Sequence, residues 1–415
     1  MRVAVLGSGG REHAIAWKLT QVNPPEDIFV IPGNGGTGNN VDIKPMEMEE
    51  LKYFCLESKV ELLVVGPEDP LAAGIVDYFQ DTAIKVFGPD QKAASLESSK
   101  IHAKKFMKTY GVVSGDFWLP GEGDDIEAVI EQLAGQVVIK YDGLAAGKGV
   151  FVCSSVTEAE QALNEIKNRY GETAPFLIEE KLSGWELSII AFTDGQSIKM
   201  LLPSQDHKAV YEGDKGPNTG GMGAYCPVPA CTPDLLQRIQ RDIVEPTLRG
   251  IQKEQMNYKG VIYFGLMITS EGPRLLEYNV RFGDPETEVI LPALKSNLLN
   301  LILACLNGTL DQYQLEFFPG YFVDVVLTSA GYPASYVTGK PISGLDQINP
   351  NTLIFHAGTK YVDGKLLSSG GRVLNVVGHG NDLKTAIEGV YGEVQKIHFE
   401  NMYYRQDIGQ KGLKV

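Results

Sequence analysis

Short apolar runs alternate with stretches of helical periodicity along residues 1–100 of the chain. Apolar runs that end in loop residues are typical of buried parallel strands, and the helical stretches between them complete a βαβ rhythm. This pattern predicts an N-terminal Rossmann-like parallel sheet with helices on both faces. The apolar runs, in chain order, are VAVLG, IFVIPG, VELLVVGPED and IKVFGP.

The pattern changes over residues 101–320, where neighbouring strand-like runs are separated by short turns. Such runs are typical of antiparallel hairpins, and they predict an α+β domain with a smaller unit at about residues 122–190. Residues 203–233 are rich in loop residues, and a stretch of that length is more often functional than idle. A third, β-rich domain is expected over residues 321–415. The predicted fold class is therefore α/β and α+β, in several domains.

The stretch KYDGLAAGKGV, residues 140–150, suggests a phosphate-binding loop. It does not match the P-loop pattern, because Gly143 and Gly147 are one residue too close and Gly149 stands where Ser or Thr is required. Both flanks are strand-like, so the loop is expected to cap a hairpin. Lys140 could then reach a phosphate as a point charge, with Lys148 secondary. A surface hairpin without a ligand is the alternative interpretation.

Candidate metal ligands lie in the stretch RLLEYNVRFGDPETE. Alternate residues of a strand share a face, so Glu277, Asn279 and Arg281 are expected on one side. A carboxylate and an amide oxygen are the hard ligands that Mg²⁺ between phosphates requires. The alternative is a polar edge that faces solvent.

A second phosphate-binding candidate follows the first predicted strand, where Gly7, Gly9 and Gly10 lead into a helix. The N-terminus of a helix attracts phosphate. Glu12 replaces the third glycine of the dinucleotide fingerprint, so a sugar phosphate is a better candidate than NAD. Glu68, in the stretch GPEDPL, is a carboxylate suited to ribose hydroxyls, although an ordinary loop carboxylate is an equally simple interpretation.

Charge and composition exclude several classes of protein. The net charge of −15 argues against non-specific binding to nucleic acid or an anionic membrane, since both need clustered Lys and Arg. The five cysteines include no C-x-x-C pair, which favours thiols in a reducing compartment. No secretory signal or membrane-spanning stretch is recognised, so a cytoplasmic protein is expected. Nothing indicates a coiled coil, and a monomer is expected.

The motifs together resemble the ATP-grasp ligases and, more narrowly, the glycinamide ribonucleotide synthetase family. The resemblance spans essentially the whole chain. It implies a central ATP-grasp domain at residues 101–320, with the unit at about 122–190 as its lid. The motifs that carry it are GSGGREHA at 7–14, GPEDPL at 66–71, GLAAGKGV at 143–150, GPNTGGMGAY at 216–225 and RFGDPETE at 281–288.

The resemblance implies that one set of residues binds ATP together with the glycine-rich loop. Lys100 and Lys140 would contact phosphates, and Glu186 would hold the ribose hydroxyls. Glu179 would accept a hydrogen bond from the adenine amino group, and Leu182 would offer its backbone to the ring.

A second set would hold the metal and the reacting groups. Glu277 and Asn279 would bind Mg²⁺ (or Mn²⁺), while Arg281 and Asp284 would face the acyl phosphate and the amine. Many ATP-grasp enzymes carry a third metal carboxylate on the preceding strand, but the stretch GVIYFGLMIT has none.

A third set would form the phosphoribosylamine pocket, namely Gly9, Gly10, Arg11, Glu68 and Arg372.

The stretch DHKAVYEGDKG departs from that family's pattern. Ala209 and Lys215 stand where an arginine and a small polar residue are expected. The roles of Asp206, His207 and Lys208 therefore stay open. His207 is either a base or a structural histidine.

The resemblance implies an ATP-dependent ligase that joins glycine to 5-phosphoribosylamine through glycyl phosphate in purine biosynthesis. One alternative is another ATP-grasp enzyme that activates formate or bicarbonate. The other is a nucleotide-binding module without catalysis.

Overall fold

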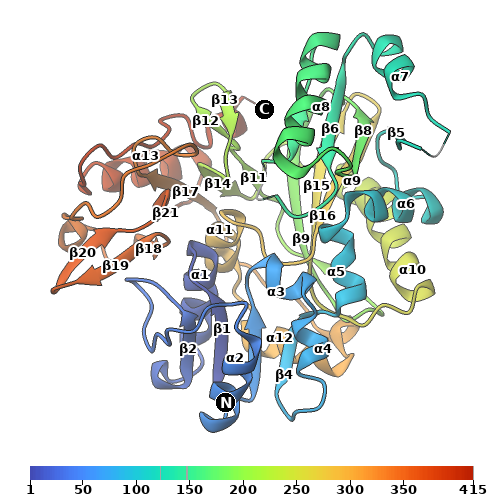
Figure 1. The fold of residues 1–415 in the computed structure, drawn as a ribbon. Helices are drawn as coiled ribbons and strands as arrows, with labels where there is room; N and C mark the ends of the chain where they lie inside the picture. Colours follow the sequence, from blue (N-terminus) through green and yellow to red (C-terminus); the bar gives the residue numbers. More distant parts are fainter. Residues whose placement is uncertain (122, 146–147, 415) are drawn as a thin grey trace.

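The N-terminal unit of the computed structural model, which describes residues 1–121, 123–145 and 148–414, is a parallel sheet in the order β2–β1–β3–β4 (Figure 1). The strands are β1 (Val3–Gly7), β2 (Ile28–Pro32), β3 (Leu62–Val65) and β4 (Lys85–Pro89). Alternate residues of β1 enter two different cores, Val3 and Val5 on one face and Ala4 and Leu6 on the other. Burial on both faces explains the continuous apolar runs, and the predicted Rossmann-like sheet is confirmed.

This sheet continues into the central part of the chain. Strand β15 (Tyr258–Thr269) pairs antiparallel with β4, with Tyr258 opposite Pro89, and it then pairs along its length with two further strands. Its partners are β9 (Trp185–Thr193), which also pairs β10 (Ile198–Met200), and β16 (Gly272–Asn279). The result is one eight-stranded sheet, so the edge that β4 would otherwise expose is paired.

A four-stranded antiparallel sheet stands apart as the lid unit (Figure 1). Lys140 lies opposite Val150 across the hairpin β6–β7, which confirms that the glycine-rich loop caps a hairpin. The unit packs its own small hydrophobic core around Ile139 and Ile178. Its elements are β5 (Phe117–Trp118), α7 (Ile126–Gln132), β6 (Val137–Tyr141), β7 (Val150–Val152), α8 (Val156–Tyr170) and β8 (Phe176–Glu180).

The C-terminal unit is a five-stranded antiparallel sheet in the order β11–β14–β17–β21–β18. Two of its strands come from the stretch that the sequence shows as loop-rich, residues 203–233. That stretch also forms the hairpin β12–β13, which lies between the C-terminal unit and the lid in Figure 1. The strands of the five-stranded sheet are β11 (Gln205–Asp206), β14 (Gly223–Cys226), β17 (Tyr321–Thr328), β18 (Leu353–His356) and β21 (Arg372–Gly380). Two separate hairpins are formed by β12 (Ala209–Tyr211) with β13 (Lys215–Asn218) and by β19 (Thr359–Val362) with β20 (Lys365–Ser368).

Several helices begin at capping residues that the sequence supplies. Ser99 accepts a hydrogen bond from His102 N at the start of α6, and Asn297 does the same for Asn300 N at the start of α12. The helices not yet named are α1 (Gly10–Thr20), α2 (Met48–Glu57), α3 (Glu68–Ala72), α4 (Ile75–Tyr78), α5 (Gln91–Ser98), α6 (Lys100–Tyr110), α9 (Pro233–Ile239), α10 (Glu245–Lys253), α11 (Glu286–Ala293), α12 (Leu298–Asn307) and α13 (Leu383–Val394).

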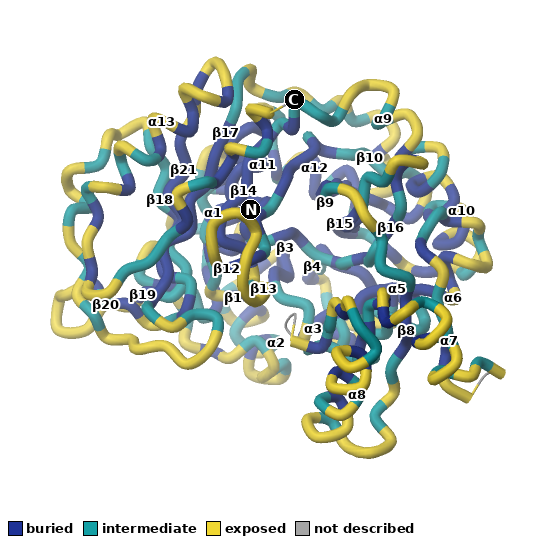
Figure 2. Tube along the Cα trace, turned by 90° about the horizontal axis from the view of Figure 1, so that it is seen from above, coloured by how far each residue is buried: buried dark blue, intermediate teal, exposed yellow. Residues whose placement is uncertain are grey.

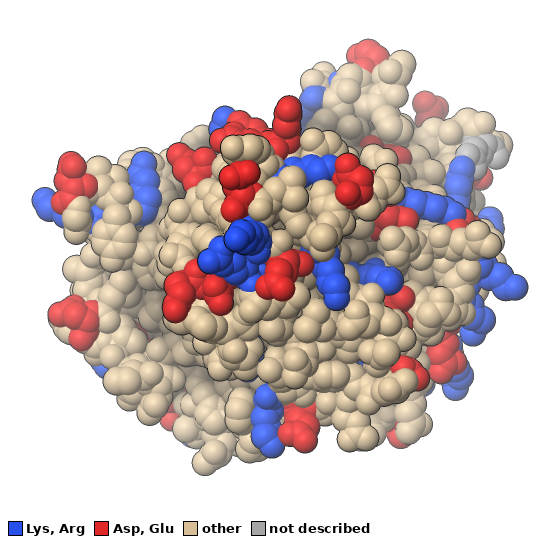
Figure 3. Space-filling view, turned by 90° about the horizontal axis from the view of Figure 1, so that it is seen from below, with Lys and Arg blue, Asp and Glu red and all other residues tan. Residues whose placement is uncertain are grey.

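The burial pattern shows where the core sits. Buried residues concentrate in the inner strands, while α8 and the β19–β20 hairpin carry much of the exposed surface (Figure 2). On the face drawn in Figure 3, Lys and Arg side chains lie in small groups beside Asp and Glu. Within the described part of the chain, no helix has an apolar stretch long enough to cross a bilayer.

Candidate active site

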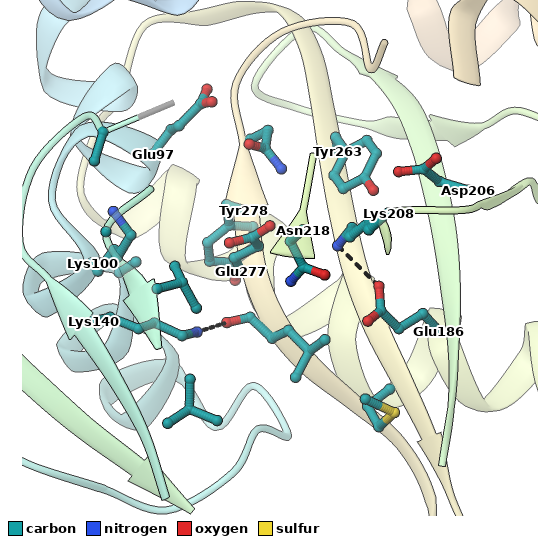
Figure 4. A pocket seen from close by; sticks show the side chains of 18 of the residues that line it. Glu97, Lys100, Lys140, Glu186, Asp206, Lys208, Asn218, Tyr263, Glu277 and Tyr278 are labelled. Atoms are coloured by element: carbon teal, nitrogen blue, oxygen red, sulfur yellow. Dashed lines mark hydrogen bonds and ion pairs between the residues drawn. The ribbon is translucent and has the colours of Figure 1, made fainter. Parts of the chain in front are cut away.

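A cavity of about 550 Å³ lies between the lid unit, strand β16 and the first turns of α3 and α6 (Figure 4). Side chains that are far apart in the sequence meet there. The predicted site residues that line it are Arg11, Glu68, Lys100, Lys140, Gly149, Glu179, Leu182, Glu186, Glu277, Asn279, Arg281, Asp284 and Arg372.

Lys140 and Glu179 form a buried ion pair on adjacent lid strands. Lys140 Nζ lies 2.7 Å from Glu179 Oε1, and Lys104 Nζ lies 2.8 Å from Glu179 Oε2. All three residues are at most 5% exposed. Both carboxylate oxygens of Glu179 are therefore engaged by lysines, and Lys104 is a cation that the sequence patterns did not indicate.

Lys100 supports the glycine-rich loop from the start of α6. Its Nζ donates to Gly143 O at 2.7 Å, and burial lowers the pKa of Lys100 in spite of the nearby Glu277. Gly149 lines the cavity, whereas the Lys148 side chain is exposed outside it. The predicted loop residue Gly147 lies outside the described residues.

The candidate metal ligands occupy one face of β16. Burial acts to raise the pKa of Glu277, but Lys208, Lys140 and Lys100 outweigh it and hold that pKa below its usual value. Glu277 is therefore ionised at neutral pH. Asn279 Oδ1 lies next to it on the strand and accepts from Arg281 Nη2 at 3.2 Å.

The donors present fit a magnesium ion that is shared with a nucleotide. Among the residues that the structure describes, no three His, Cys, Asp or Glu side chains gather as a metal cluster. The protein therefore offers one carboxylate and one amide oxygen, and Mg²⁺ commonly takes one or two protein carboxylates with the remaining positions filled by phosphate and water.

Arg281 is held by two carboxylates from other elements. Its guanidinium lies 3.4 Å from Glu68 and 3.2 Å from Glu97, and Glu97 Oε2 also accepts from Val280 N at 2.7 Å. Burial raises the pKa of Glu97, and Glu68 adds to this, against the opposing charge of Arg281. The sequence did not indicate Glu97 as a site residue, because it lies near the end of an ordinary amphipathic helix and no local pattern marks its role.

Residues 206–208, whose roles the sequence leaves undecided, lie on the side of the cavity opposite Lys100 and Lys140 (Figure 4). Lys208 Nζ pairs with Glu186 at 2.9 Å, and this carboxylate raises the pKa of Lys208 (Figure 4). The ring of His207 is fully buried instead, and burial lowers its pKa to about 3. Its Nδ1 lies 3.2 Å from Gly223 O, and its Nε2 accepts from Gly409 N at 3.3 Å. These contacts favour a structural role for His207 over a base.

A second cavity, of about 460 Å³, adjoins the first. The two share Asp284 and Arg372, whose Nη1 lies 3.0 Å from Asp284 Oδ1. Gly9 lines the second cavity, whereas Gly10 packs on Asn375 and Glu288 and lines neither. The remaining lining residues are Ser8, Pro32, Gly33, Asn34, Ala357, Gly358, Thr359, Lys360, Ser369 and Gly370.

The lid hairpin, the buried lysines and the Glu277–Asn279 strand define an ATP-grasp protein. Solved structures with this fold include a biotin carboxylase–β,γ-ATP complex from Campylobacter jejuni, with a TM-score of 0.73 at 11% identity over 100% of this chain and 95% of that one. At that identity, the similarity concerns the fold alone.

The chain belongs to the phosphoribosylglycinamide synthetase family. Models of its N, ATP-grasp and C domains match residues 1–97, 98–287 and 322–411. Phosphoribosylamine–glycine ligase of Halalkalibacterium halodurans is 45% identical, covering 100% of this chain and 97% of that protein. Phosphoribosylamine–glycine ligase of Synechocystis sp. is 43% identical, covering 100% of this chain and 100% of that protein. The crystal structure of the Thermotoga maritima ligase has a TM-score of 0.82 at 37% identity, covering 98% of this chain and 100% of that one.

Proposed function

We propose that this protein is an ATP-dependent ligase that joins glycine to 5-phosphoribosylamine, giving glycinamide ribonucleotide, ADP and phosphate in purine biosynthesis. The observation that carries the proposal is the meeting of two cavities at Asp284 and Arg372. One cavity is lined by the cations and metal ligands expected around a triphosphate. The other is lined by glycines, small polar residues and Lys360, which suit a sugar phosphate.

In the first cavity, Lys100 and Lys140 contact the phosphates and the backbone at Leu182 receives the adenine ring. Glu186 holds the ribose hydroxyls, and the glycine-rich hairpin covers the nucleotide. The contact between Glu179 and the adenine amino group remains a prediction. The adenine would have to compete with Lys104 and Lys140 for the Glu179 carboxylate.

Glu277 and Asn279 would hold the divalent cation, Mg²⁺ (or Mn²⁺). When bound, such an ion supplies neutralisation of negative charge on the phosphates.

The reaction proceeds in two displacements. A glycine carboxylate oxygen attacks the γ-phosphorus, the bond to the β-phosphate oxygen breaks, and glycyl phosphate and ADP form. The amine of phosphoribosylamine then attacks the acyl carbon, the bond from that carbon to the phosphate oxygen breaks, and an amide forms while the amine proton leaves with the phosphate as hydrogen phosphate. Lys140 and Arg281 offset the charge of the transferred phosphoryl group.

Asp284 and Arg372 stand where the two substrates meet. Arg372 Nη1 also donates to Gly220 O and to Asp284 O, so its guanidinium is fixed in place between the cavities. The Asp284 carboxylate would orient the amine, with Gly9, Arg11 and Glu68 nearby. Holding both reactants in one geometry is the main source of rate enhancement in such a site.

ADP release by the purified protein tests the function. With Mg-ATP, glycine and freshly generated phosphoribosylamine, ADP release should depend on both acceptor substrates. Release no greater than in a glycine-free control would refute the proposal. Formate- or bicarbonate-dependent release in place of glycine would indicate one of the other ATP-grasp activities. The cytoplasmic location, the monomeric state and the absence of nucleic-acid partners stay predictions.

A further inference from the structure

The segment at residues 207–220, called here the pocket loop, supplies part of the first cavity but has little support of its own. Lys208, Asn218, Thr219 and Gly220 line the cavity. Between them runs the two-stranded hairpin β12–β13, in which residues 211–218 are exposed. A two-stranded hairpin alone is marginally stable in water, so other parts of the chain must fix this loop.

Tyr332 OH and Arg372 Nη1 hold Gly220 at one end of the loop. Further support comes from near the other end of the chain, at residues 403–411, called here the C-terminal segment. Arg405 is the largest fully buried side chain, with 0% exposure. Its Nη1 donates to Ala209 O at 3.0 Å and to Asp214 Oδ1 at 3.0 Å, both in the pocket loop. Its Nε and Nη2 each donate to Asp407 at 2.7 Å. A buried guanidinium that is paired bidentately gives a rigid attachment.

Further contacts extend this attachment along the loop. Asp407 Oδ2 accepts from Gly213 N at 2.8 Å, and Tyr403 OH donates to Val210 O at 3.1 Å. Lys411 Nζ lies 2.7 Å from Asp214. The hydrogen bond from Gly409 N to His207 Nε2 reaches the residue next to Lys208. The C-terminal segment therefore contacts the loop from its first residue to the turn of its hairpin.

We propose that Arg405 and Asp407 are positioning residues, which hold the pocket loop so that Lys208 and Asn218 face the cavity. The proposal rests on the proposed function for its kinetic readout. Neither residue lines a cavity among the described residues, so neither touches substrate, and both act through the loop.

The proposal predicts a selective defect. Lys100, Lys140 and Glu179 lie on α6 and on lid strands, and among the described residues the C-terminal segment makes no hydrogen bond to these elements. Freeing the pocket loop should therefore impair turnover more than it weakens binding of a non-hydrolysable ATP analogue, whose contacts with Lys100 and Lys140 stay in place.

The principal variants are Arg405→Gln and Asp214→Asn. The second is the milder change, because Asp214 is 46% exposed and has a φ of 57°, a conformation that asparagine tolerates. It removes the charge that Arg405 and Lys411 contact and keeps the backbone. Arg405→Lys tests whether the charge alone suffices without bidentate geometry.

We expect Arg405→Gln to lower kcat by about tenfold or more, and Asp214→Asn by a smaller factor. The control is Leu51→Ala, a buried site in α2 of the N-terminal unit, which should lower Tm without changing kcat by more than about twofold. If Arg405→Gln and the control variant lose the same Tm and have the same kcat, the proposal would be overturned.

Hydrogen exchange gives a readout that does not depend on the activity. In Arg405→Gln, the amides of residues 209–219 should exchange faster than in the wild type, while those of β6 and β8 stay unchanged. Unchanged exchange in the pocket loop would reject the positioning role even if turnover fell. If the wild type turns over no substrate but Arg405→Gln still exchanges faster than the wild type in the pocket loop, only the proposed function would be rejected.

Discussion

Lys140 Nζ lies 2.7 Å from Glu179 Oε1, on the cavity side of the lid sheet, where both residues are almost fully buried. Lys104 approaches the other oxygen of the same carboxylate. One negative charge therefore holds two buried positive charges, and one of these is the lysine proposed to contact the nucleotide. The position of Lys140 depends on this carboxylate as well as on its own strand.

Replacing the shared carboxylate should destabilise the protein and weaken ATP binding. Glu179→Gln leaves two buried lysines without a counter-charge, and removal of one partner from a buried pair costs about 3–5 kcal/mol of the free energy of unfolding. Urea unfolding and the KM for ATP measure the two effects. Glu165→Gln is the control, since it breaks an exposed pair with Arg169 that contributes about 0–1 kcal/mol. Equal losses in the two variants would contradict a shared buried counter-charge.

Neutralising the candidate metal carboxylate should weaken divalent cation binding directly. Glu277→Gln keeps the shape of the side chain but removes the charge, so the affinity for Mn²⁺ in the presence of a non-hydrolysable ATP analogue should fall by about tenfold or more. Electron paramagnetic resonance of free Mn²⁺ measures this without turnover. Glu271→Gln, at a carboxylate that is 74% exposed in the preceding turn, should leave the affinity unchanged. Full Mn²⁺ affinity in Glu277→Gln would reject the assignment of this ligand.

Gly10 should not tolerate a side chain. A Cβ there would overlap Asn375 Nδ2 and Glu288 Oε1, both of which are buried. Gly10→Ala should therefore cost about 1–3 kcal/mol through overpacking and raise the KM for phosphoribosylamine by displacing the N-terminus of α1. Gly38→Ala, where no atom lies within 4 Å of the added Cβ, is the control. Thermal unfolding that gives the same Tm for both variants would show that the space at Gly10 can expand.

Acid should destabilise the native state in part through the buried, neutral His207. Burial, together with the charges of Lys411 and Arg405, lowers the pKa of His207 from 6.5 to about 3. Below pH 6.5 the unfolded chain binds a proton that the native state excludes, so stability falls as pH falls from 6.5 toward 3.

The wild type should therefore lose about 2 kcal/mol more than His207→Gln when the pH is lowered from 7 to 5. Urea unfolding at the two pH values measures the difference. His398→Gln, at an exposed histidine, should behave as the wild type does. An identical loss in His207→Gln and the wild type would show that His207 is protonated in the native state.

Local patterns predicted the elements that form the floor and cover of the site. The period of a strand placed Glu277 and Asn279 on one face, and strand-like flanks made the glycine-rich loop the cap of a hairpin. Local patterns did not predict the strands within residues 203–233, because these strands are short and their pairing depends on the C-terminal unit. Helices α11 and α12 are separated where Leu294 and Lys295 turn to meet the chain near Phe317 and Glu316.

The elements, the family motifs and the residue types suited to phosphate and metal chemistry could be predicted from the sequence, since these depend on neighbours in the chain. Which charges meet depends on the packing of the folded chain. Lys104 and Glu179 are 75 positions apart, and Arg405 and Ala209 are 196 positions apart. No periodic pattern in the sequence indicates such pairs, because the packing of sheets and helices sets the distance between the two side chains. Burial then fixes the protonation of His207 and the charge balance around Lys140, which are properties of the folded interior.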